Sequence, residues 1–291
     1  MLSGLSAFTL TPMDEDGVVD TDHLGRLVAR LAATEVDSIG VLGSTGSYMY
    51  LTARERARAL AAAVEAAGST PVLAGIGALR TSDVLAHARA AEEAGAAAAL
   101  LAPVSYLPLT EADFAALVTD VTAASGLPLC LYNNPSTTHF SMSEDLVVRL
   151  ARNKLVRAVK NPAQATGMDE KIIRLRGATP DDFVLGYSGD ALIAAPLGAG
   201  ADAWYSVIAG ALPELCLGIW SARGTAELAA RHGALEPLWA LFRAHGGIRV
   251  LPHILELMGE GRAPLPRPLQ PLAPAIVAEI DAALDAVRAP A

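Results

Sequence analysis

Several residue types that support particular functions are scarce in this sequence of 291 residues. Its two cysteines, Cys130 and Cys216, lie far apart, which excludes a disulfide-built fold and predicts reduced thiols. Its 22 Lys and Arg are outnumbered by 31 Asp and Glu, for a net charge of −9, and the basic residues are scattered. We therefore expect neither a nucleic-acid partner nor an anionic membrane surface as partner.

Long hydrophobic segments are also missing. The N-terminus lacks a basic region followed by a long apolar stretch, so a signal peptide is not expected. The apolar run 95–103 is too short to span a bilayer. The sequence predicts a soluble, cytoplasmic protein without membrane contact.

The sequence lacks the motifs of several enzyme classes. Its six histidines show no HxH, HExxH or paired-carboxylate spacing, and only His139 follows a predicted strand, where an exposed loop histidine is ordinary. There is no GxSxG nucleophile motif, no GxGxxG dinucleotide motif and no P-loop. We expect no metal site, no serine triad and no bound nucleotide.

Eight short apolar runs recur every 20–35 residues or so, with amphipathic segments between them. They read as continuously apolar, which is typical of parallel strands that are covered on both faces. The runs are 6–10, 37–42, 71–76, 97–102, 128–132, 155–160, 183–186 and 203–208.

The segments between these runs have helical periodicity. Residues 21–33 place leucines and a valine at helical spacing, and 52–67 begins with Thr52 and Glu55, the pattern of a capping box. The alternation predicts an α/β fold, a (β/α)8 TIM barrel over residues 1–213. Residues 214–291 are predicted to form a C-terminal helical extension packed on the barrel. Its expected helices are 214–230, 234–244, 252–259 and 274–287.

A doubly wound open sheet is the competing fold. It is disfavoured because the first strand–helix turn carries no glycine motif. In a TIM barrel the active site lies at the carboxyl ends of the strands, so the polar residues that follow each apolar run are the candidates.

Lys160 differs from the other two lysines because it alone ends a predicted strand. A lysine that points into a barrel mouth loses hydration, which favours the neutral amine. A neutral amine can attack a ketone to form an iminium. The alternative is a strand-end lysine paired with a carboxylate, and position alone leaves both interpretations open.

Two other groups follow neighbouring predicted strands. Tyr132 ends the strand before that of Lys160, so its phenol can relay protons at the amine. The alternative is a buried aromatic residue whose hydroxyl bonds a backbone group. Ser44 and Thr45, flanked by glycines, provide hydroxyls and backbone N–H groups suited to a carboxylate or a phosphate.

In order and spacing, these groups resemble the dihydrodipicolinate synthase / N-acetylneuraminate lyase family of pyruvate-handling (β/α)8 enzymes. Residues 43–46 (GSTG) are similar to its GTTG or GSTG motif, and residues 132–135 (YNNP) to its YNxP motif. Lys160 follows YNxP by about 28 residues, as the Schiff-base lysine of the family does. The resemblance extends over nearly the whole chain.

The resemblance implies a role for each group. Pyruvate would condense with Lys160, Tyr132 would carry protons, and Ser44 and Thr45 would hold the keto-acid carboxylate. The family is usually homotetrameric, often a dimer of dimers, and uses no cofactor beyond the covalent lysine. Four residues near other strand ends complete the predicted substrate-binding set: Tyr106, Thr137, Gly186 and Ser206.

The sequence departs from the synthases of the family around the second substrate. Thr137 stands where they carry an arginine after YNxP, and Ser47 stands where they carry a glutamate after GTTG. Residues 103–106 (PVSY) replace PYYN, and 161–163 (NPA) replace Glu/Asp-x-Ser after the lysine. These changes argue against the lysine-pathway aldehyde as partner, whereas the pyruvate end is intact.

The leading hypothesis is a class I lyase or aldolase that forms a Schiff base with pyruvate-derived 2-keto acids and takes an aldehyde as its second partner. The 2-keto-3-deoxy sugar acids are one candidate class of substrate. One alternative is a dehydratase that uses the same iminium to expel a hydroxyl group. The other is a family member that binds a keto acid but has lost turnover.

Overall fold

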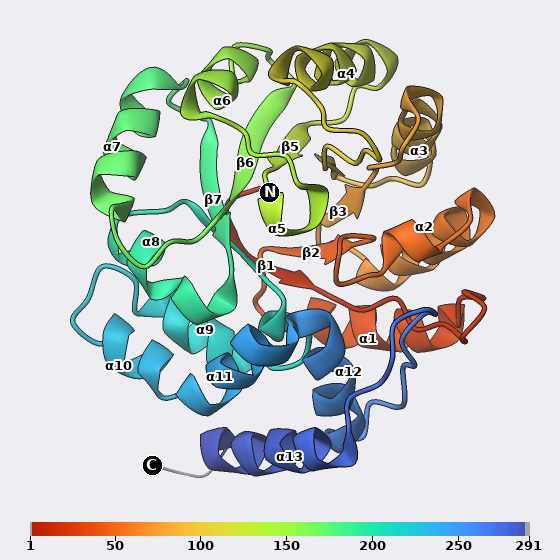
Figure 1. Cartoon of the computed structure of the whole chain (residues 1–291), viewed down its shortest axis with the longest axis vertical. Helices are drawn as coiled ribbons and strands as arrows, with labels where there is room; N and C mark the ends of the chain where they lie inside the picture. The colour runs from red at the N-terminus through yellow and green to blue at the C-terminus, as the bar shows by residue number, and fades with distance from the viewer. Residues whose placement is uncertain (1, 289–291) are drawn as a thin grey trace.

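The computed structural model describes residues 2–288, in which eight parallel strands form a closed barrel (Figure 1). Each strand pairs with the next along the chain, and β1 pairs with β8 to close the ring. The strands are β1 (Gly4–Phe8), β2 (Ser38–Val41), β3 (Val72–Gly75), β4 (Ala98–Leu101), β5 (Leu129–Tyr132), β6 (Val156–Pro162), β7 (Val184–Ser188) and β8 (Ala203–Ser206). Every predicted apolar run overlaps one strand, and the TIM barrel is confirmed.

Helices follow the strands and surround the barrel (Figure 1). Those of the barrel are α1 (Thr21–Ala32), α2 (Ala53–Ala67), α3 (Thr81–Glu93), α4 (Glu111–Ala124), α5 (Pro135–Thr138), α6 (Glu144–Leu150), α7 (Met168–Ala178), α8 (Ala194–Gly198) and α9 (Pro213–Ser221). Then come α10 (Leu228–Gly233), α11 (Glu236–His245), α12 (Gly247–Leu257) and α13 (Pro274–Arg288). Short 3₁₀ turns follow three strands: η1 (Tyr48–Tyr50), η2 (Asp190–Leu192) and η3 (Ile208–Gly210).

The strands separate two hydrophobic cores, one outside the barrel and one inside it. In β5, Leu129 and Leu131 pack outward among the helices, whereas Cys130 and Tyr132 face the interior. This alternation follows from the period of two in a strand, which sends successive side chains to opposite faces. Both faces are buried, as the unbroken apolar runs predicted.

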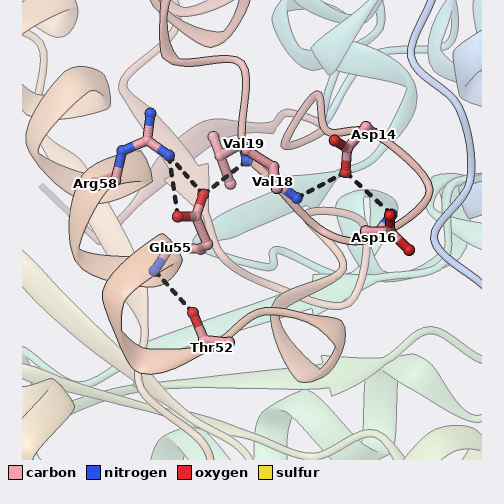
Figure 2. Close-up of polar contacts among 7 residues, drawn as sticks. All are labelled: Asp14, Asp16, Val18, Val19, Thr52, Glu55 and Arg58. Carbon is pink, nitrogen blue, oxygen red and sulfur yellow. Dashed lines mark hydrogen bonds and ion pairs between the residues drawn. The ribbon is translucent and has the colours of Figure 1, made fainter.

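The predicted capping box at Thr52 forms only in half (Figure 2). Thr52 Oγ1 accepts the amide of Glu55, but the Glu55 carboxylate does not return to Thr52. It accepts the amide of Val19 at 2.7 Å and pairs with Arg58 instead. The Glu55 carboxylate thus bonds the amide of Val19, in the loop after β1, and this contact holds the loop against α2.

The C-terminal helices differ from the prediction in two places. The helix predicted over 214–230 is split into α9 and α10, with Gly224 in the left-handed region (φ +74) between them. Pro252, predicted to begin a helix, lies inside α12. The boundary after residue 213 stays a prediction; α9 itself packs against β1. None of the helices within residues 2–288 combines the length and apolar character needed to cross a membrane.

Candidate active site at the barrel mouth

Lys160 is buried near the carboxyl end of β6, with 3% of its surface exposed. Its Nζ lies over aromatic rings, 3.7 Å from the ring centroid of Phe8, 4.5 Å from that of Tyr132 and 5.8 Å from that of Tyr205. No ion pair of Lys160 exists among residues 2–288. The structure therefore does not support the alternative of a lysine paired with a carboxylate.

Tyr132 is placed beside Lys160 by the strand register. The Cα atoms of the two residues are partners between β5 and β6, and both side chains face the interior. The Tyr132 hydroxyl accepts a hydrogen bond from Asn134 Nδ2 at 2.8 Å and lies 3.4 Å from Ser44 Oγ. Since Asn134 only donates here, the hydrogen of the Tyr132 hydroxyl is free to point to Ser44 or to a substrate.

The loop that carries Ser44 and Thr45 has an unusual backbone. Leu42 at its start has a φ of +55, a conformation that residues with a side chain rarely adopt. Its carbonyl oxygen fills the space that a Cβ of Gly75 would occupy, at 1.8 Å from that position. Glycine at position 75 therefore allows the loop to fold onto the end of β3. The strain lies at the edge of the candidate site, where such conformations are frequent.

Arg56 supports this side of the barrel from outside. It is 4% exposed and donates to the carbonyl oxygens of Gly75 (2.8 Å) and Gly77 (2.9 Å), at the end of β3. Its guanidinium lies 5.2 Å from the ring centroid of Tyr48. Burial lowers the pKa of Arg56 to about 10, and burial likewise raises the pKa of Tyr48. A buried cation thus holds the end of β3 and the ring of Tyr48 together.

Asp190 connects the ends of β7 and β8. One carboxylate oxygen accepts from Trp204 Nε1 at 2.9 Å, and the other accepts from the amides of Val207 (3.0 Å) and Ile208 (2.8 Å). Burial raises the pKa of Asp190, although these donors act in the opposite direction. The backbone oxygen of Asp190 lies 2.9 Å from His232 Nε2, which links this joint to α10.

These groups surround one cavity of about 770 Å³, within the usual size range of sites for small molecules. Of the predicted site residues, Lys160, Tyr132, Ser44, Thr45 and Thr137 line it. The lining residues come from the carboxyl ends of the strands and the segments that follow them, and from α11, α12 and the segment after α12.

Three predicted positions lie elsewhere. Gly186 is the partner of Lys160 in the register, but the space beside it is filled by the ring of Tyr205, 2.2 Å from the position of a Cβ. The Ser206 hydroxyl is fully buried and accepts the amide of Ala209. Tyr106 is 92% exposed, and none of the three lines the cavity.

Sequence reasoning missed several residues of the cavity wall. Asn134 belongs to the YNNP motif, so its position two residues after Tyr132 was a usable signal. Phe242, Arg243 and Ile248 line the cavity from the C-terminal helices, and nothing in the local sequence marks them. Within residues 2–288, no three His, Cys, Asp or Glu side chains gather as a metal site requires.

Comparisons with known proteins agree with this architecture. Residues 1–287 match the dihydrodipicolinate synthetase family. The chain is 35% identical over 215 residues to 4-hydroxy-tetrahydrodipicolinate synthase of Salinibacter ruber, which covers 73% of this chain and 70% of that protein. The crystal structure of dihydrodipicolinate synthase from Agrobacterium tumefaciens is 45% identical, covers 98% of both chains and superposes with a TM-score of 0.95. That of the Acinetobacter baumannii enzyme, complexed with pyruvate, is 25% identical, covers 99% of both chains and has a TM-score of 0.89.

The closed barrel and these relatives define the chain as a class I lyase or aldolase of the Schiff-base type. It belongs to the dihydrodipicolinate synthetase family. The predicted family, fold and enzyme class are thereby confirmed.

Proposed function

We propose that this enzyme cleaves or forms the bond between C3 and C4 of a pyruvate-derived 2-keto acid, with Lys160 as the Schiff-base residue. The observation that carries the proposal is the buried amine of Lys160, which lines the cavity beside Tyr132 and has no carboxylate partner among residues 2–288. An amine in such surroundings is held ready as a nucleophile. Ser44 and Thr45 bind the carboxylate of the keto acid.

In the direction of synthesis, Lys160 Nζ attacks the C2 carbonyl of pyruvate to give a carbinolamine. The carbinolamine loses its hydroxyl as water, with a proton supplied through Tyr132, and an iminium remains. A proton leaves C3 to give an enamine, and C3 bonds to the carbonyl carbon of an aldehyde, whose oxygen takes up a proton. Water then adds to the iminium and releases the product with the amine restored; cleavage is the reverse.

The proton path follows from the hydrogen bonds of Tyr132. Asn134 donates to the phenol oxygen, and Ser44 Oγ lies on its other side. The donated bond stabilises a phenolate while the proton is on the substrate, which can receive it directly or as the hydrogen of Ser44 when Tyr132 replaces that hydrogen. Asn134 therefore acts as a positioning residue for Tyr132.

The partner of pyruvate differs from that of the synthases. Thr137, an exposed residue on the cavity wall, stands where the resemblance places their carboxylate-binding arginine. This position gives an incoming aldehyde a hydroxyl in place of a guanidinium. We propose a 2-keto acid substrate outside the lysine pathway, with no metal and no bound cofactor.

The test combines trapping with turnover. Incubation with pyruvate and borohydride should leave a reduced adduct on Lys160, located by peptide mass spectrometry, and Lys160→Arg should leave none. Pyruvate release from a panel of 2-keto-3-deoxy acids then identifies cleavage. Loss of water without pyruvate release would identify a dehydratase, and an adduct without either reaction would identify a binding protein. No adduct in the wild-type protein would refute all three.

We further propose that the enzyme is a cytoplasmic homotetramer. Tyr106 and Leu107 are 92% and 69% exposed, and they adjoin Val104 and Ser105, which line the cavity. Large apolar side chains at such a rim favour contact with a second copy. Light scattering after gel filtration should give four times the mass of the chain, and Tyr106→Ser should lower it. A monomer mass for the wild-type protein would contradict this proposal.

A further inference from the structure

The charges in the cavity are unevenly distributed. Within the described residues, its charged lining residues are Lys160, Asp190 and Arg243. Asp190 is buried, and both of its carboxylate oxygens already accept hydrogen bonds from the protein. Lys160 is assigned to the ketone. Arg243 is thus the cation of the cavity wall that has no role in the proposed chemistry.

Arg243 has donors to spare. It lies on α11, where its Nη2 contacts the carboxylate of Glu236, seven residues earlier in the chain. The side chains of Arg243 and Glu236 are 47% and 56% exposed. A guanidinium carries five N–H donors in a planar fork that matches a carboxylate, and the contact with Glu236 engages Nη2 alone. The remaining donors are open to a ligand.

The surroundings of Arg243 favour an extended ligand. The residues next to it on the wall include Phe242, Gly246, Gly247 and Ile248, which together present an apolar surface without another anion. The cavity, at about 770 Å³, leaves room beyond the keto-acid group at Lys160. Because Lys160 and Arg243 line the same cavity, a ligand held by its keto group at Lys160 can extend within it toward the guanidinium.

We propose that Arg243 binds a second carboxylate at the far end of the substrate, so that the enzyme acts on 2-keto diacids. This inference rests on the proposed function, because it assumes that the 2-keto group is held at Lys160. Arg243 is then the specificity residue for the part of the substrate that does not come from pyruvate. The C-terminal extension supplies it, since neither the strands nor the loops that follow them bring another arginine to the cavity within residues 2–288.

The test measures Schiff-base formation and needs no turnover. Borohydride trapping at Lys160 is titrated with 2-oxoglutarate, 2-oxoadipate and 2-oxopimelate, each beside the uncharged-ended acid of equal chain length (2-oxopentanoate, 2-oxohexanoate, 2-oxoheptanoate). Within each variant, the half-saturating concentration of the uncharged-ended acid is divided by that of the diacid. A charge-assisted hydrogen bond predicts a ratio of about 10 to 100 for at least one chain length.

Three variants and one control test whether Arg243 is the cause of this ratio. Arg243→Gln should bring it close to one, Arg243→Lys should restore part of it, and Glu236→Gln should keep or increase it because the guanidinium is released. Arg231→Gln is the matched control: Arg231 is an arginine of the same extension that pairs with Glu227 and does not line the cavity, and its loss should leave the ratio unchanged.

The outcomes separate this inference from the proposed function. If wild-type protein traps pyruvate at Lys160 but gives a ratio near one at every chain length, only the role of Arg243 is refuted. The same holds if the ratio is high but Arg243→Gln leaves it high. If wild-type protein traps no keto acid at all, the proposed function fails and this inference fails with it.

Discussion

The two ends of the cavity are built in different ways. The inner end consists of buried side chains on neighbouring strands, with Lys160 and Tyr132 fixed as register partners in β6 and β5. The outer end consists of half-exposed side chains on the short helix α5 and on the C-terminal helices, with Thr137 and Arg243 as its polar groups. Strand register fixes the inner end in place, whereas the outer end can change by substitution at the surface.

We expect the inner end to carry out the reaction and the outer end to select the substrate. A change at the inner end disturbs groups that the barrel packs on all sides, so it should affect the rate with any substrate. A change at the outer end meets solvent and should affect the choice of substrate while the chemistry persists. Variants at the inner end should therefore lower the rate with every substrate, whereas variants at the outer end should change which substrate is preferred.

The largest effect is expected for Lys160→Arg. The arginine side chain also reaches the aromatic rings but cannot form the iminium, so kcat should fall by at least about 10³-fold with every keto acid. Steady-state kinetics measure the loss, and the thermal midpoint measures whether the fold survives. Substantial activity in this variant would mean that an acid–base reaction without covalent chemistry occurs at the inner end.

Tyr132→Phe should have the next largest effect. It removes one hydroxyl at the inner end, and proton transfer by a positioned group contributes about 10²- to 10⁴-fold. The fall should appear in kcat for all substrates alike. Asn134→Ala removes the donor to Tyr132 and the acceptor of the exposed Ser136 hydroxyl, and it should cost less. An equal loss would assign Asn134 a direct contact with substrate.

Asp190→Asn tests the hydrogen bonds by which Asp190 connects the ends of β7 and β8. An asparagine offers one acceptor oxygen where Asp190 accepts three N–H groups through two oxygens, so at least one buried donor loses its partner. The free energy of unfolding should drop by about 1–3 kcal/mol. Urea denaturation at neutral pH measures it. A neutral effect would show that the joint does not depend on the charge.

The smallest effect concerns His87, a half-buried residue of α3 behind the inner end. Burial and the nearby Arg56 lower the pKa of His87 from 6.5 to about 4. The unfolded chain therefore binds this proton more readily, so the contribution to stability is complete above pH 6.5 and declines as the pH falls toward 4. Denaturation between pH 8 and 4 should show a shallower decline in His87→Gln than in the wild-type protein. Parallel profiles would exclude His87 as the source.

Much of the inner end could be predicted from sequence because its determinants are local. Apolar runs mark the strands, and Lys160 and Tyr132 each end one of them, so strand pairing alone brings the two together. Gly186 was predicted to bind substrate, but the space beside it is filled by the Tyr205 ring, which comes from the next strand. The residue pattern within one strand does not show which side chain of the next strand will lie beside it.

At the outer end, Thr137 could be placed by its position after the YNNP motif, but Arg243 could not be predicted. Arg243 comes to the cavity through the packing of α11, far along the chain from the motifs of the barrel. Glu55 gives a smaller example: its spacing from Thr52 satisfies the capping box, yet the amide of Val19, brought near by the loop after β1, takes the carboxylate. In both cases long-range packing decides between locally acceptable partners.

The ring-lined surroundings of Lys160 have a consequence for the charge of the intermediate. The iminium proposed at Lys160 carries a fixed positive charge, and within the described residues Lys160 Nζ lies over aromatic rings and has no carboxylate partner. The quadrupoles of the rings attract the positive charge but do not neutralise it. The substrate must therefore bring its own counter-ion, the carboxylate beside the ketone. A ketone without a carboxylate would lack this counter-ion, so the enzyme should select 2-keto acids over simple ketones.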